Sequence, residues 1–122
     1  ARFDPFRIMQ SGGAMMGLGL ALMPFMGSWQ AMVAGCAVIG FGFYMLHSGL
    51  QARVTEVMPA ARASAVSLHA FFLFIGIGLG PMLYELTATA LGFLPTLLAN
   101  SAAITLVSFL AVARLRREAR AA

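Results

Sequence analysis

The chain has 122 residues, of which 61% are apolar and only 10% are charged, and its net charge is +4. A typical soluble domain carries about 25% charged residues, so this composition argues against a surface that faces water and favours one that faces lipid. The basic residues are all arginines and are not interleaved with exposed aromatic residues on a polar scaffold, which argues against nucleic-acid binding.

Four apolar segments are long enough to cross a membrane, since a transmembrane helix needs about 20 mostly apolar residues. The sequence therefore predicts an all-α membrane protein with four transmembrane helices. The predicted spans are residues 8–26, 30–50, 64–85 and 94–113, with a charged loop at 51–63 and a tail at 114–122.

The arginines indicate how these spans are oriented. With four spans, both termini and the loop at 51–63 lie on one side of the membrane, and every arginine falls there. Arginine-rich segments stay in the cytoplasm, so this side is predicted to be cytoplasmic and the "GSW" and "LTATALGF" connections external. The arginines are Arg2, Arg7, Arg53, Arg62, Arg114, Arg116, Arg117 and Arg120.

Prolines and glycines indicate breaks and close helix packing. Pro59 disfavours a helical conformation at Met58 and should interrupt the helix there. Pro81 removes a backbone hydrogen bond inside the third span, which predicts either a hinge near Gly80 or a static kink. The stretch "GAMMG" and the run from Gly76 to Gly80 both have small residues four apart, a spacing that favours close packing between helices of the same protein.

The second and third spans each carry a polar face. Because polar groups are costly against lipid, these faces should look into protein or into a watery cavity. The predicted cavity residues are Tyr44, His47, Ser48, Phe71 and Gly78, chosen from two helical faces. Those faces comprise Gln30, Ala37, Gly40, Tyr44, His47, Ser48 and Gln51 in the second span, and Ser64, Ser67, Phe71, Gly78, Met82 and Glu85 in the third.

The other two spans are less polar. The first has little beyond Gln10 and Ser11, so it is expected to be the span most exposed to lipid. The fourth carries an amide and three hydroxyls that suit hydrogen bonds between helices, namely Asn100, Ser101, Thr105 and Ser108.

No signature of a soluble enzyme is present. The glycine-rich runs lie inside apolar spans instead of between a strand and a helix, two histidines and one cysteine are too scattered for a metal site, and no nucleophile elbow occurs. We therefore expect no catalytic residue, metal or cofactor. His47 and His69 can be ordinary hydrogen-bonding or packed residues, and Arg53, Glu56 and Arg62 can simply orient the loop and pair with one another.

One stretch resembles a known family. The sequence "LQARVTEVMPAARASAVSLHAFFLFIGIGLGPML" is similar to the segment that joins the tenth and eleventh helices of major facilitator superfamily transporters, in particular proton-driven drug-efflux members. The similarity covers about 35 residues, and no complete G-x-x-x-D-R-x-G-R gating motif accompanies it. The matching residues are Gln51, Ala52, Arg53, Thr55, Glu56, Pro59, Ala61, Arg62, Ala65, Leu68 and the run from Gly76 to Pro81.

The resemblance implies a C-terminal piece of a twelve-helix transporter in a bacterial inner membrane, whose spans are helices nine to twelve. It implies proton-coupled efflux of small organic molecules by alternating access. The implied partners are the lipid bilayer, the remaining helices of the same transporter, the substrate and protons.

Two alternatives from the residues stay open. Four spans in about 110 residues also describe small multidrug-resistance transporters, which work as dimers, although those depend on an acid well inside their first helix and none occurs here. The chain could also be a membrane subunit that transports nothing and uses its polar faces only for packing.

Overall fold

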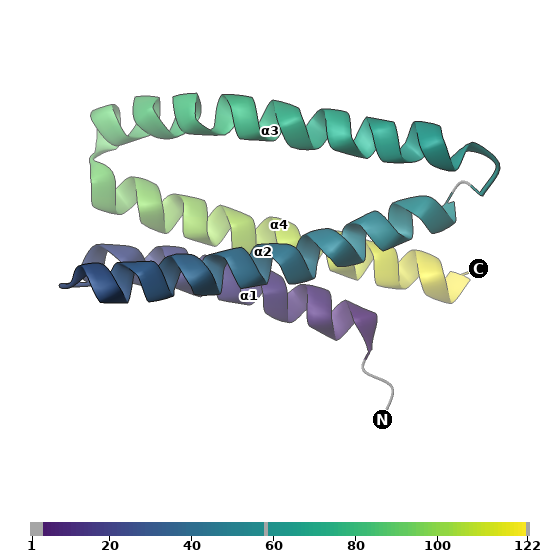
Figure 1. Ribbon diagram of the computed structural model, residues 1–122, viewed down its shortest axis with the longest axis horizontal. Coiled ribbons are helices and arrows are strands. Elements are labelled where there is room, and N and C mark those ends of the chain that lie inside the picture. The colour runs from purple at the N-terminus through teal and green to yellow at the C-terminus, as the bar shows by residue number, and fades with distance from the viewer. Residues whose placement is uncertain (1–3, 58, 122) are drawn as a thin grey trace. The chain divides into compact units, whose positions relative to one another are not determined.

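The fold consists of long helices (Figure 1). In this computed structural model, which describes residues 4–57 and 59–121, there are four α-helices and no strand. Arg2 and Met58, named above, lie outside the described residues. The helices are α1 (Pro5–Leu22), α2 (Trp29–Val57), α3 (Arg62–Leu91) and α4 (Phe93–Ala121), with short 3-10 helices η1 (Met23–Phe25) and η2 (Pro59–Ala61).

All four described helices are long and apolar enough to cross a membrane. This confirms the prediction of an all-α chain with four membrane-length helices. The helices extend beyond the predicted spans, because α2 continues through most of the segment expected to be a loop and ends at Val57. An ion pair one turn apart, between Arg53 and Glu56, supports this extension.

Helix α1 begins three residues before the predicted span. Asp4 caps it, since its side-chain Oδ1 accepts a hydrogen bond of 3.0 Å from the backbone N–H of Phe6. Pro5 follows at the first helical position, where its missing N–H costs nothing.

Gly92 alone separates α3 from α4. Its φ of 92° and ψ of 163° lie in a region open almost only to glycine. The rings of Tyr84 and Phe93 meet edge to face with centroids 6.5 Å apart, so the chain folds back at this residue. A single glycine therefore replaces most of the predicted "LTATALGF" loop.

The chain divides into two compact units, which are described separately. The first unit comprises Ala1–Gly49 and Leu97–Ala122, and the second comprises Leu50–Thr96. The boundaries fall within α2 and α4, so the first unit contains α1, most of α2 and most of α4.

In the first unit, α1 and α2 approach each other through glycines. A Cβ atom added to Gly12 would lie 2.6 Å from the carbonyl oxygen of Gly42, and one added to Gly42 would lie 2.6 Å from the carbonyl oxygen of Gly12. Further along, Gly35 faces the Met26 side chain and Gly49 faces Met9. The backbones are close enough to exclude any side chain at the Gly12–Gly42 contact.

A second set of small residues joins α1 to α4. Gly13 lies against Ser108, and Gly17 lies against Thr105. The Ser101 hydroxyl donates a hydrogen bond of 2.6 Å to the carbonyl oxygen of Gly17. The "GAMMG" prediction of close packing is confirmed, as is an interhelical hydrogen bond from Ser101. Thr105 and Ser108 donate instead to carbonyls of their own helix.

These contacts correct the expectation that the first span is the one most exposed to lipid. In the first unit α1 contacts both α2 and α4, and Met9, Gly12, Gly13, Gly17 and Gly19 are buried in it. The expectation was wrong because it was based on the small number of polar side chains in this span, whereas the helix packs on its neighbours through glycines.

An ion pair fastens the start of α1 to the end of α4. The Asp4 carboxylate accepts a hydrogen bond from the Arg116 guanidinium, and both side chains are about one-third exposed. The guanidinium also lies over the Phe6 ring, 5.5 Å from its centroid, within the range of a cation–π contact. The purple start of α1 and the yellow end of α4 lie toward the same end of the first unit (Figure 1).

Replacing Gly42 by alanine should destabilise the chain by about 1–3 kcal/mol, because the new methyl group would push against the backbone of α1. Gly40→Ala is the matched control two residues away, since a Cβ atom there would meet nothing within 4 Å. The control should be neutral or stabilising by up to about 1 kcal/mol, because alanine favours helix. Unfolding in mixed detergent micelles, followed by circular dichroism, measures both, and equal effects would contradict the glycine contact.

Candidate functional site

The candidate site begins with the face of α2 that turns away from α1. At 3.6 residues per turn, Tyr44 and Gly40 lie on the side of the helix opposite Gly42. Tyr44 is 67% exposed, and a Cβ atom on Gly40 would meet open space. The packing of the first unit thus leaves the predicted polar face of α2 uncovered by α1.

The three predicted cavity residues on α2 are close together. The His47 ring stacks on Phe43, with centroids 5.2 Å apart and an angle of 7° between the planes. The Ser48 hydroxyl donates to the carbonyl oxygen of Met45 at 3.4 Å, so its hydrogen bond stays within the helix. The Tyr44 hydroxyl has no hydrogen-bond partner among the residues that the structure describes, which leaves it able to bind a ligand.

The two predicted cavity residues on α3 belong to the second unit. Phe71 is 58% exposed and meets the neighbouring Phe72 ring edge to face. Gly78 is exposed, and a Cβ atom on it would meet nothing within 4 Å. Since Tyr44, His47 and Ser48 belong to the first unit, the joint cavity wall stays a prediction.

The predicted hinge lies in an uninterrupted helix. Pro81 is inside α3, which is helical from Arg62 to Leu91. Cβ atoms on Gly76 and Gly80 would meet nothing within 4 Å, so nothing else in the second unit packs closely on them. The hinge and the packing role of this run therefore stay predictions as well.

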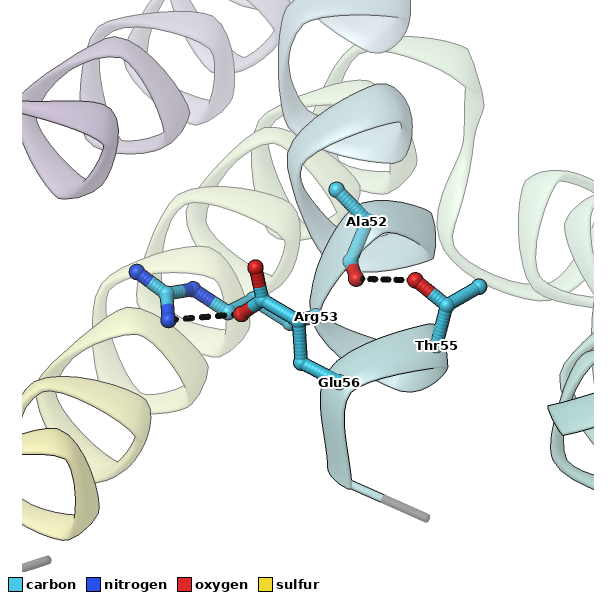
Figure 2. Close-up of polar contacts among 4 residues, drawn as sticks. All are labelled: Ala52, Arg53, Thr55 and Glu56. Carbon is cyan, nitrogen blue, oxygen red and sulfur yellow. Dashed lines mark hydrogen bonds and ion pairs between the residues drawn. The ribbon is translucent and has the colours of Figure 1, made fainter. Parts of the chain in front are cut away.

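The charged residues of the predicted loop lie at helix ends, and Figure 2 shows the two of them on α2, Arg53 and Glu56. Arg53 Nη1 and Glu56 Oε2 are 2.9 Å apart on the last turns of α2, and the Thr55 hydroxyl donates to the Ala52 carbonyl oxygen at 2.7 Å. Arg62 is exposed and is the first residue of α3. The Arg53–Glu56 ion pair is local to one helix, so it suits the pairing role expected for these charges.

Three features were missed from the sequence. Gly35, Gly42 and Gly49 recur every seven residues along α2, a signal of one continuous packing face that the polar residues obscured. Asp4 followed by Pro5 is a signature of a helix start, and it predicts the observed beginning of α1 at Pro5. The ion pair of Asp4 with Arg116 had no local signal, because the two residues are 112 positions apart.

The described residues include no group of three or more His, Cys, Asp or Glu side chains that could hold a metal ion. Comparison with known proteins adds no assignment for the site. No protein-family model, curated protein or solved structure matches the chain.

If the Tyr44 face does not support the fold, Tyr44→Ala should change the free energy of unfolding by less than about 0.5 kcal/mol, as exposed substitutions usually do. Met9→Ala is the contrasting change, because Met9 is 1% exposed and fills the contact with Gly49. It should cost about 2–5 kcal/mol through the cavity it leaves. A large loss for Tyr44→Ala in the same micelle assay would show that this face is structural.

Proposed function

We propose that the chain is part of a secondary active membrane transporter that moves small organic molecules, with protons as the coupling ion, by alternating access. In this proposal the four helices cross the bacterial inner membrane with both termini in the cytoplasm. The remaining helices of the transporter complete the substrate cavity.

The observation that carries this proposal is the division of α2 into two opposite faces. One face carries Gly42 and packs on α1, whereas the other carries Tyr44, His47 and Ser48 and is left uncovered by α1. Polar groups inside a membrane are stable only when they face protein or water. A polar face that α1 leaves uncovered in a membrane-length helix is therefore what the wall of a translocation path would require.

The ends of the helices in the first unit support the proposed orientation. Asp4 contacts Arg116, and Met9 contacts Gly49, so the start of α1, the end of α4 and the region of α2 near Gly49 lie at one end. This end carries Arg7 and the four arginines of the tail. A concentration of arginines at one end of a helix bundle is typical of a cytoplasmic surface.

The sequence similarity around Arg53 and Pro81 supports the choice of transporter class. The acid needed by a small dimeric multidrug transporter would lie well inside α1, yet the acid nearest to that helix is Asp4, which caps its first turn. This difference favours the larger transporter over the dimeric one.

Reconstituted by itself in proteoliposomes, the chain should show no proton-coupled transport of a cationic dye. Alternating access requires two repeats that move about a midplane site, and the proposal assigns only part of one half to this chain. Measurable coupled transport by the chain alone would favour the small dimeric transporter instead. The matched control is protein-free liposomes with the same imposed pH gradient.

In the complete transporter, Tyr44→Ala and Phe71→Ala should change substrate preference by about tenfold in relative kcat/KM, the scale at which a pocket contact discriminates between substrates. Val38→Ala and Phe72→Ala are the matched controls, because they truncate exposed apolar residues on other faces of the same two helices. The controls should change the preference by less than about twofold. Equal effects of both sets would contradict the cavity wall.

A further inference from the structure

A basic groove lies between the start of α1 and the end of α4, entirely within the first unit. It has a volume of about 370 Å³ and is lined by Asp4, Phe6, Arg7, Arg116, Ala119 and Arg120. Three arginines thus face one aspartate, so the groove carries an excess of positive charge.

Arg116, one of the residues that line this groove, is held in position by two contacts. Its guanidinium contacts the Asp4 carboxylate on one side and the Phe6 ring on the other. Asp4 is in turn fixed by accepting the backbone N–H of Phe6. A guanidinium has five N–H donors in a planar fork, so the contact with Asp4 leaves donors for a further anion.

The two other arginines supply unneutralised charge. Arg7 and Arg120 are exposed and form no ion pair with any residue that the structure describes. Together with the fixed Arg116 they offer several N–H donors to one small anion. Phosphate oxygens suit such a set because arginine binds them through paired, charge-assisted hydrogen bonds.

Apolar surface leads away from the groove along both helices. On α4, Phe109 lies seven residues before Arg116, on the same helical face, and is 43% exposed. On α1, Leu18 lies eleven residues after Arg7, again on the same face, and is 63% exposed. A ligand with a phosphate head and long apolar tails would match both the groove and these surfaces.

We propose that the groove binds the phosphate headgroup of an anionic phospholipid, with the acyl chains along the exposed faces of α1 and α4. Basic pockets between helices at the cytoplasmic surface are suited to such headgroups. The inference rests on the membrane insertion stated under the proposed function and does not depend on transport. A failure to bind lipid would therefore leave the transporter proposal intact. A failure of the transporter proposal would likewise leave the lipid proposal intact.

The test measures lipid binding to the purified 122-residue chain by native mass spectrometry in a non-ionic detergent. Phosphatidylglycerol, phosphatidylcholine and inorganic phosphate are titrated separately. The variant Arg7→Gln/Arg120→Gln removes two charges from the groove. The control Arg114→Gln/Arg117→Gln removes two charges from the same end of the chain, at exposed residues outside the groove lining.

The unmodified chain should bind phosphatidylglycerol in preference to phosphatidylcholine. The groove variant should bind phosphatidylglycerol about tenfold more weakly, and the control should stay within about twofold of the unmodified chain, because only the former loses contacts with the headgroup. Circular dichroism should show equal helix content in all three proteins. Salt should weaken the binding, as expected for contacts between charges.

Three results would overturn the proposal. Equal losses in both variants would show general attraction to a basic end in place of a built site. No loss in the groove variant would exclude the groove as the binding site. Tight binding of inorganic phosphate, with displacement of the lipid, would identify a free anion as the occupant.

Discussion

The contact between the backbones of Gly12 and Gly42 is the constraint on which the first unit depends. Apolar helices gain little from the hydrophobic effect when their surroundings are equally apolar, so they associate through close packing and hydrogen bonds. Glycine permits the closest packing because no side chain separates the two backbones. Helix α1 uses this device twice, with Gly12 towards α2 and with Gly13 and Gly17 towards α4.

The same packing sets the rotation of α2 about its axis. Once Gly42 faces α1, the 3.6-residue repeat turns Tyr44 to the opposite side. One face therefore holds the helix pair together, and the other is available for a ligand or a further helix. If the polar face also packed on α1, the side chains of α1 would occupy it and no ligand could bind there.

Among the described residues, charge is confined to one end of the first unit and contributes to its packing there. The pair of Asp4 and Arg116 is partly exposed, so it adds modestly to stability, but it brings the first turn of α1 to the last turns of α4. Phe6 holds the same guanidinium through its ring. The ends of a lipid-length bundle meet water and headgroups, where an ion pair of this kind is far less costly than inside hydrocarbon.

The sequence by itself determined four membrane-length helices, because length and apolarity are properties of each segment alone. It also determined that Tyr44 and Ser48 share a polar face, because helical spacing fixes which residues of one helix lie together. Only the tertiary structure decided that α1 packs between two neighbours and that Asp4 meets Arg116. Spacing along a chain defines the faces of a helix, whereas the partner of each face depends on how several helices fit together.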